Sequence, residues 1–275
     1  MPEDSPPLAL LHEDPDIVAV AKPSGQAVIA ARGESRSLCL QKQLESRLHR
    51  RLWVVHRIDR DASGVVLFAL NADAHRELSL AFEHRQVVKT YAAFVAGSIE
   101  PSRGLIEVPL HPARKDKTRP ALPGEPGALP SSTGYATRKR WLLPVILRSS
   151  VPAERRRIRN PGGSFGTGQT EVPQDDRTAV SLLEVHPLTG RHHQIRVHLR
   201  SAGAPILSDP LYGRGLMPEG LAGAPCARLA LHARRIDVPA PRGGGRLVVE
   251  APLADDLVAL AEWLDGCSEK DESGV

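Results

Sequence analysis

HRIDRDASG, residues 56–64, is a short polar stretch with an apolar run on each side. The run 52–55 (LWVV) precedes it and the run 65–70 (VVLFAL) follows it. Short runs rich in β-branched residues are typical of buried strands, and the small Ser63-Gly64 pair is typical of a turn. The stretch therefore predicts a turn between two buried strands, and this turn carries one histidine, two arginines and two aspartates.

The chemistry of this turn centres on Asp59, which lies between Arg57 and Arg60. A nearby cation favours the charged form of a carboxyl group, so we expect Asp59 to be ionised. An ionised carboxylate held in place can be a nucleophile, a general base, a metal ligand or half of a structural ion pair. The turn alone leaves these roles open.

Three known arrangements share parts of this pattern. A kinase catalytic loop needs His-Arg-Asp in succession, but here Ile58 intervenes, and the chain has neither a DFG motif nor a preceding glycine-rich loop. A glycosidase usually needs a second carboxylate, to which the sequence does not point. A metal site would draw on nearby histidines, but their spacing fits neither HExxH nor a CxxC-type site: His186, His192, His193 and His198.

The composition is that of a globular chain with clustered cations. The 275 residues are 41% hydrophobic and carry a formal net charge of +4, and this length allows a sizeable core. Acidic residues collect at both termini. Lysine and arginine gather in five clusters: 47–60, 112–119, 138–140, 155–159 and 191–200. Such clusters predict a polyanionic partner or, alternatively, a solvated basic surface.

The sequence contains no sign of export or of a membrane span. No apolar run approaches the ~18 residues that a bilayer requires, and the acidic, proline-rich start differs from a secretory signal. The cysteines Cys39, Cys226 and Cys267 suggest neither a disulfide framework nor a zinc pattern. We therefore expect a cytoplasmic protein with no membrane partner and no bound metal.

Hydrophobic periodicity predicts many strands and fewer helices. Strands are expected at 17–21, 65–70, 87–96, parts of 104–110, 135–147 and 179–186, and at 228–238 and 246–250. Helices are expected at 37–50, after a cap at Asn71, around Ile195, Leu199 and Ala202 with Gly203 as the stop, and from a cap at Asp255 to Gly266. Irregular alternation of this kind predicts an α+β fold with a mixed, mostly antiparallel sheet flanked by helices and long loops.

Two stretches rich in proline, glycine and arginine, 112–134 and 148–177, are predicted as long loops. Whether 148–177 contacts a partner through its arginines or is disordered stays open. We expect a flexible start at 1–9, one domain at 10–265 and a flexible acidic tail at 266–275.

Residues 56–59 followed by Ser63-Gly64 resemble the HRLDxxTSG box of the RluA-like family of pseudouridine synthases. Four further stretches resemble other boxes of this family in the same order: 10–25, 87–97, 188–213 and 229–241. Ile58 replaces the usual leucine, Ala62 a common threonine, and His192 a common threonine or serine. The resemblance implies a pseudouridine-synthase-like fold and a small member without the N-terminal S4 domain that some relatives carry.

The resemblance also implies an activity. The expected reaction isomerises specific uridines of structured RNA, in tRNA, rRNA or both, to pseudouridine without a cofactor. Asp59 is implied as the catalytic carboxylate, with Arg196 beside it and Tyr91 stacked on the flipped base. Which chemical step Asp59 carries out, and which RNA is modified, stay open.

RNA contacts are implied for Arg57, which would fill the gap left by the flipped nucleotide, and for His56, Lys89 and Arg191. A monomer is expected. Two alternatives remain: an RNA-binding or folding helper, which does not need Asp59, and a nucleoside glycosidase, which does not need the basic surface. Turnover of free uridine separates the glycosidase from an enzyme that requires RNA.

Overall fold

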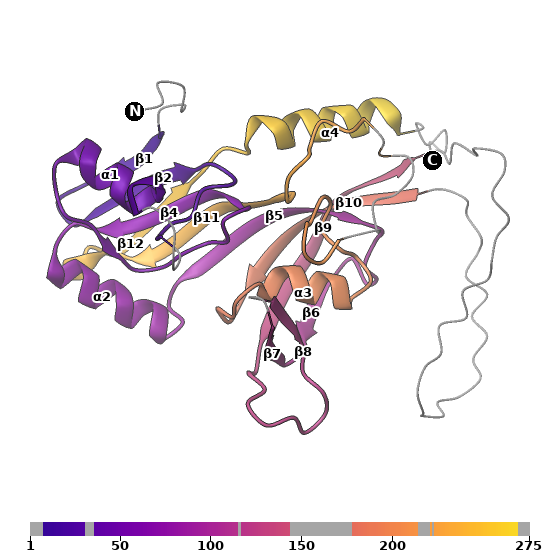
Figure 1. Ribbon diagram of the computed structural model, residues 1–275, viewed down its shortest axis with the longest axis horizontal. Helices are drawn as coiled ribbons and strands as arrows, with labels where there is room; N and C mark the ends of the chain where they lie inside the picture. Colours follow the sequence, from indigo (N-terminus) through magenta and orange to yellow (C-terminus); the bar gives the residue numbers. More distant parts are fainter. Residues whose placement is uncertain are drawn as a thin grey trace, which may run out of the picture.

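The computed structural model describes residues 8–30, 36–114, 117–143, 178–213, 221 and 223–268. Within this part of the chain, a ten-stranded sheet has the order β1-β2-β4-β11-β5-β10-β9-β6, with β12 beside β11 and β3 beside β4 (Figure 1). Its strands are β1 (Leu10–Glu13), β2 (Ile17–Lys22), β3 (Trp53–Val54), β4 (Ser63–Ala69), β5 (Val88–Ala96), β6 (Arg103–Glu107), β9 (Ser132–Leu143), β10 (Thr178–Pro187), β11 (Leu231–Pro239) and β12 (Arg246–Glu250).

The sheet is mixed and mostly antiparallel, as predicted, because only β4 and β11 among its described strands pair in parallel. That pairing is limited to Ser63 and Gly64 opposite His232 and Ala233. Gly64 has a φ of +116°, and a Cβ there would lie 2.2 Å from the carbonyl oxygen of Ala233. Only glycine fits both the backbone conformation and the close approach of the two strands. It thereby places the end of the 56–64 turn directly against β11.

Four α-helices accompany the sheet in the described residues: α1 (Leu40–Leu48), α2 (Ala72–Glu83), α3 (Gln194–Ser201) and α4 (Asp255–Cys267). The predicted cap of α2 is confirmed, since the Asn71 side chain accepts a hydrogen bond of 2.8 Å from the amide of Ala74. No helix in these ranges is long and apolar enough to cross a membrane.

The predicted ends of α4 are wrong. Ala254 occupies the capping position without a side-chain hydrogen bond, and Asp255 is already helical. Its negative charge in the first turn is still favourable, because it faces the positive end of the helix dipole. Gly266 does not stop the helix, which continues to Cys267. A glycine near a helix end costs only about 1 kcal/mol relative to alanine, so it does not enforce termination.

The prediction of one long loop at 112–134 is also wrong. This region contains most of a hairpin of β7 (Leu110–Ala113) and β8 (Lys117–Pro120), and β9 begins at Ser132. The prolines are tolerated because the hairpin is a separate two-stranded sheet with open edges. The hairpin projects from the body of the molecule beside α3 (Figure 1). The other predicted loop, 148–177, lies outside the described residues, as do most of the two predicted flexible ends.

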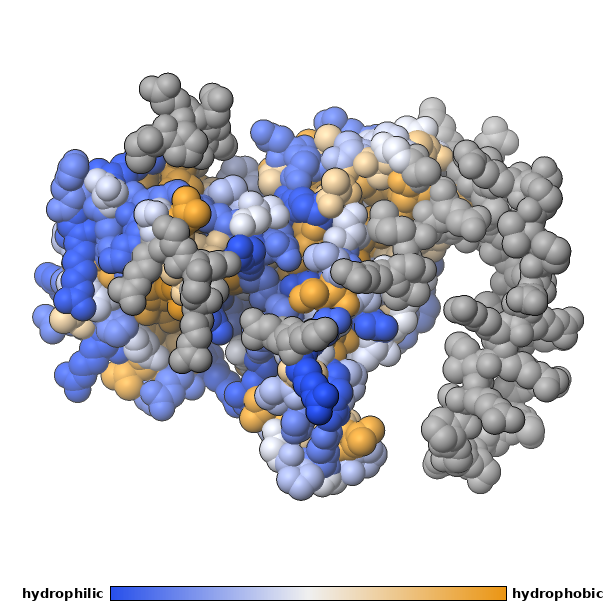
Figure 2. All heavy atoms as spheres, in the orientation of Figure 1, coloured by the Kyte–Doolittle hydropathy of each residue, from blue (hydrophilic) through white to orange (hydrophobic). Residues whose placement is uncertain are grey.

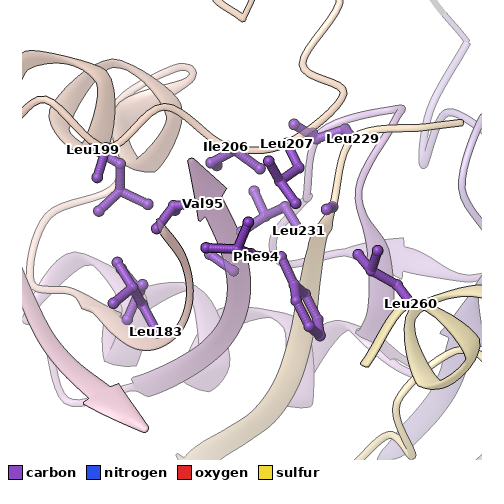
Figure 3. Packing of buried hydrophobic residues seen from close by; sticks show 14 of the residues in the cluster. Phe94, Val95, Leu183, Leu199, Ile206, Leu207, Leu229, Leu231 and Leu260 are labelled. Carbon is purple, nitrogen blue, oxygen red and sulfur yellow. The ribbon is translucent and has the colours of Figure 1, made fainter. Parts of the chain in front are cut away.

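Two hydrophobic clusters make up most of the core. One lies around β2, β4, α1 and α2, and the other around β5, β9, β10, α3 and α4. In the second cluster, Leu199 of α3 and Leu260 of α4 lie on opposite sides of the strand residues Phe94 and Val95 (Figure 3). Tyr91 of β5 packs against both clusters. The seam between them therefore runs past Tyr91 and the end of the 56–64 turn.

Candidate active site

The 56–64 turn is held in place by the end of β2. Lys22 is buried there, and its ammonium group donates hydrogen bonds of 2.7–2.8 Å to three carbonyl oxygens, one of them from Arg60. Burial lowers the pKa of Lys22 to about 7. The Ser24 hydroxyl donates to the carbonyl of Asp61 at 2.6 Å, and the amide of Gly25 donates to the carbonyl of Arg60 at 2.9 Å. These contacts hold the backbone of the turn in place and thereby fix the position from which the Asp59 side chain extends.

His56 fixes the other end of this turn. Its Nε2 accepts a hydrogen bond of 2.9 Å from the amide of Leu67, and its ring stacks on Phe82 with a centroid separation of 5.1 Å. Burial, together with the charge of Lys89, lowers the pKa of His56 to about 3. The imidazole is therefore neutral and engaged within the protein. The contact with RNA that was predicted for His56 stays a prediction.

Asp59 shares the guanidinium group of Arg196 with a second carboxylate. Arg196 donates a hydrogen bond of 3.3 Å to Asp59, and two hydrogen bonds of 2.7 and 2.9 Å to Asp209. Arg196 lies in the first turn of α3 as predicted, but this helix is buried from Gln194 to Leu199 rather than along one stripe. Although burial opposes it, the hydrogen bonds that Arg196 donates to Asp209 raise the pKa of Arg196 above its ordinary value. Arg196 is thus a permanent cation behind Asp59.

A small cavity of about 100 Å³ opens in front of Asp59. Its lining includes Tyr91 and Lys89 from β5, Arg57 from the turn and Arg191 from the segment before α3. Burial and, to a lesser degree, the charge of Asp59 raise the pKa of Tyr91 well above its ordinary value, so the phenol stays protonated. Burial lowers the pKa of Lys89. The cavity therefore combines a carboxylate, a neutral phenol and cationic groups.

A wider cleft of about 660 Å³ shares Asp59, Arg57 and Arg191 with this cavity. Residues 27–30 line one part of it, and the β7–β8 hairpin lines another through Lys117 and its neighbours. Hydrophilic side chains cover most of the face shown in Figure 2, with apolar patches on the hairpin and near α4. A cleft with several cations around a small cavity suits an anionic polymer that presents a single group to the cavity.

Gln194 organises the segment that enters α3. Its side-chain oxygen accepts hydrogen bonds from the Thr189 hydroxyl and the amide of Arg191, and its amide group donates to Ser132 and Thr133. His193 has a φ of +52°, and burial lowers its pKa to about 4. Hydrogen bonds therefore hold this segment in one conformation, in which Arg191 and His193 line the cleft.

The described residues contain no group of three or more His, Cys, Asp or Glu side chains that could hold a metal ion. His192 and His193 lie together, but as stacked rings with centroids 3.7 Å apart. The Nδ1 atom of His193 is engaged with the hydroxyl of Tyr212 at 2.9 Å. This arrangement differs from a cluster of ligands aimed at a common point.

Residues 16–201 match the sequence pattern of the RNA pseudouridylate synthase family. The chain belongs to this family. It is 31% identical over 251 residues to the dual-specificity RNA pseudouridine synthase RluA of Escherichia coli, an alignment that covers 91% of this chain and 95% of that protein. It is 29% identical over 264 residues to the ribosomal large subunit pseudouridine synthase D of Nitrosomonas europaea, covering 93% of this chain and 65% of that relative.

The fold is also that of pseudouridylate synthases. The structure of human RNA pseudouridylate synthase domain containing 1 superposes with a TM-score of 0.64 at 23% identity, covering 96% of this chain and 97% of that one. The predicted α+β class and the predicted resemblance to the RluA-like family are therefore confirmed. Members of the RNA pseudouridylate synthase family are isomerases that act on RNA.

The structure brings most of the predicted site residues of this pseudouridylate synthase together. Five of them line the small cavity, and Arg196 lies directly behind it: Arg57, Asp59, Lys89, Tyr91 and Arg191. Sequence reasoning missed Asp209 and the structural role of Lys22. Both lie in stretches that carried the family resemblance, 188–213 and 10–25, but nothing in their local pattern indicated which distant residue each contacts.

Proposed function

We propose that this protein isomerises specific uridines in structured RNA to pseudouridine without a cofactor, with Asp59 as the catalytic carboxylate. The observation that carries the proposal is the position of Asp59. Its side chain is 22% exposed, lies in a cavity with Tyr91, and contacts the fixed cation of Arg196. A carboxylate that is accessible and also hydrogen-bonded to a buried cation is oriented for reaction.

The reaction balances without an external reagent. The bond from N1 of uracil to C1′ of ribose breaks, the base turns, and a bond forms from C5 to the same C1′. The proton on C5 leaves, and N1 gains a proton, so substrate and product are isomers. Asp59 serves either by attack on the ribose or the base, or by assisting loss of a ribose proton. In each case the carboxylate must be ionised before the glycosidic bond breaks.

The other cavity residues suit the binding of an extruded base. Tyr91 offers a ring for stacking and a protonated hydroxyl near Asp59, while Arg57 lies at the mouth, where it can occupy the space that the nucleotide leaves. Lys89 and Arg191 supply positive charge for the flanking phosphates. In this proposal the protein acts as a cytoplasmic monomer, within a catalytic domain at 10–265.

Transfer RNA and ribosomal RNA are the proposed substrates. The names of the relatives point to both, because the Nitrosomonas europaea relative is a ribosomal large subunit pseudouridine synthase D and another relative, from Haemophilus ducreyi, is a tRNA pseudouridine synthase C at 29% identity. The long cleft around the cavity suits recognition of a structured RNA loop by shape and by unstacked bases.

The proposal is tested by mapping pseudouridine with carbodiimide labelling and primer extension. Unmodified tRNA and rRNA transcripts are incubated with the wild-type protein, with Asp59→Asn, and with Asp61→Asn as a control from the same turn. We expect a modified position with the wild type and with Asp61→Asn, but none with Asp59→Asn. The RNA affinity of Asp59→Asn should stay within a few-fold of the wild-type affinity.

Three outcomes would overturn the proposal. Full modification by Asp59→Asn would remove Asp59 from the catalytic role. RNA binding without modification by the wild type across both RNA classes would favour a helper protein. Turnover of free uridine by the wild type would instead identify a nucleoside enzyme, because an RNA modifier draws its binding energy from the remote backbone.

A further inference from the structure

Arg196 is oriented by Asp209 rather than by Asp59. The two hydrogen bonds to Asp209, at 2.7 and 2.9 Å, form a fork on one carboxylate, whereas Asp59 receives a single bond at 3.3 Å. The side chains of Arg196 and Asp209 are each only 1% exposed. A bidentate pair fixes the plane of a guanidinium group, so Asp209 sets the direction from which Arg196 meets Asp59.

Asp209 is itself held by the tight turn that follows it. The amides of Leu211 and Tyr212 donate to its carboxylate at 2.9 and 3.0 Å, and the amide of Gly213 donates to its carbonyl at 2.9 Å. A Cβ on Gly213 would lie 2.9 Å from that same carbonyl oxygen, so the turn has no room for a side chain there. Burial acts to raise the pKa of Asp209, but its hydrogen bonds from Arg196 and the turn lower it overall.

Tyr212 connects this turn to the projecting hairpin. The guanidinium carbon of Arg196 lies 5.1 Å from the centroid of the Tyr212 ring, in a cation–π contact. The hydroxyl of Tyr212 accepts a hydrogen bond of 2.8 Å from the backbone amide of Thr118 in β8. Leu110 of β7, Val197 of α3 and Tyr212 form a small hydrophobic cluster separate from the main core. The hairpin therefore packs on the same tyrosine that lies against Arg196.

We propose that Asp209 and Tyr212 are positioning residues for the isomerisation, and that they couple the β7–β8 hairpin to the pair of Asp59 and Arg196. This inference rests on the proposed function, because it assigns a role toward the Asp59 reaction. The hairpin lines the outer cleft through Lys117 and Thr118, so bound RNA contacts it. A well-placed hairpin holds Tyr212, Tyr212 and Asp209 hold Arg196, and Arg196 presents its charge to Asp59.

The first arm of the test compares Asp209→Asn with Asp256→Asn. Asp256 is a matched control, because it accepts two hydrogen bonds of 2.6 Å from Arg228 but lies outside the cavity lining. The single-turnover rate and the Kd are measured on a tRNA or rRNA transcript that the wild type modifies. We expect Asp209→Asn to lower the rate ~100-fold with Kd within about 2-fold, since small misplacement of a catalytic group has effects of this size.

The second arm compares Tyr212→Phe with Tyr135→Phe, and it keeps the test valid if Asp209→Asn fails to fold. Both tyrosines are buried, and each makes a hydroxyl hydrogen bond to backbone, to Thr118 and to Pro101 respectively. The Tyr212→Phe change keeps the ring against Arg196 and removes the hydroxyl, which links Tyr212 to the hairpin at Thr118 and to Nδ1 of His193. We expect the single-turnover rate of Tyr212→Phe to be about 10-fold below that of Tyr135→Phe at equal Kd, because a small displacement of a catalytic group lowers the rate.

A readout independent of activity separates this inference from the proposed function. Hydrogen exchange at the Arg196 Nε–H, followed by NMR, is slow if the guanidinium is held, and we expect it to accelerate at least several-fold in Asp209→Asn and Tyr212→Phe. Equal rates and equal exchange in Tyr212→Phe and Tyr135→Phe would overturn the coupling. If the wild type modifies no RNA, the proposed function fails, while unchanged exchange in Asp209→Asn would separately refute the positioning role.

Discussion

Two turns meet at Arg196, and they use the same kind of ion pair for different ends. The turn at 206–213 contributes Asp209, whose side chain is 1% exposed and accepts two hydrogen bonds from Arg196 and two from backbone amides. The turn at 56–64 contributes Asp59, which is 22% exposed and accepts only the single 3.3 Å bond from the described residues. One carboxylate is fully satisfied, and the other keeps lone pairs free.

If Asp59 is the catalytic carboxylate, as proposed, the difference explains how the site orients it and still leaves one of its oxygens free for a substrate. A buried charge that loses its partner costs several kcal/mol, so the closed pair of Arg196 and Asp209 must stay intact for the fold. An exposed carboxylate with one long contact costs the fold little, but it can turn its free oxygen toward a substrate. In the proposed mechanism, the closed pair supplies the rigidity, and the open one supplies the chemistry.

Removal of Arg196 should affect both turns and have the largest effect. In Arg196→Ala, Asp209 is left buried and unpaired, so we expect the free energy of unfolding to fall by about 3–5 kcal/mol. Turnover on RNA should fall by a factor of about 10³, because Asp59 loses its fixed cation. Denaturant unfolding and single-turnover modification measure the two effects.

The matched control for that variant is Arg228→Ala, whose partner Asp256 has a side chain that is 37% exposed. This change should cost less stability, because water can solvate the abandoned carboxylate. Equal losses in the two variants would show that burial does not distinguish the pairs. Wild-type turnover in Arg196→Ala would refute its role at Asp59.

Tyr91 lines the cavity next to the partly exposed Asp59, so its substitution should lower turnover and leave stability unchanged. Its hydroxyl makes no hydrogen bond within the described ranges, and its ring packs against both core clusters. We expect Tyr91→Phe to lower the single-turnover rate by a factor of about 100, with RNA affinity and melting temperature near wild type. An unchanged rate would make Tyr91 a packing residue.

The smallest expected effect is the contribution of His56, at the start of the 56–64 turn, to the pH dependence of the free energy of unfolding. The pKa of His56 is lowered from an unfolded value of 6.5 to about 3, so the folded state favours the neutral ring. Its contribution to stability is complete above pH 6.5 and is lost as the pH falls toward 3. Between pH 7 and pH 5 this group alone should reduce the free energy of unfolding by about 2 kcal/mol.

This effect is measured by denaturant unfolding at several pH values for wild type, His56→Gln and the exposed His84→Gln. We expect the dependence on pH to weaken in His56→Gln and to stay unchanged in His84→Gln. A shared dependence in all three proteins would assign the acid sensitivity to other buried histidines. His193, His198 and His232, whose pKa values burial also lowers, are the candidates.

Local sequence pattern predicted the elements that depend on neighbours in the chain. The buried strand predicted at 65–70 and the Asn71 cap are confirmed, because periodicity and capping act over a few residues. The strand begins two residues earlier than predicted, at Ser63, because Ser63 and Gly64 pair with β11. Most of the hairpin at 110–120 fell within the loop predicted at 112–134, because the prolines there are typical of loops and the contact that anchors the hairpin forms only on folding. Its apolar anchor, Leu110, packs on Val197 and Tyr212 from distant parts of the chain.

The sequence by itself determined the family, the α+β class and the residues available for chemistry, because ordered motifs and hydrophobic periods are properties of the chain. Only the tertiary structure decided how those residues share their charges. It turned His56 inward to the amide of Leu67, and it gave Arg196 a stronger partner in Asp209 than in Asp59. The physical reason is that burial and hydrogen bonding of charged groups depend on distances between remote segments, which no local pattern encodes.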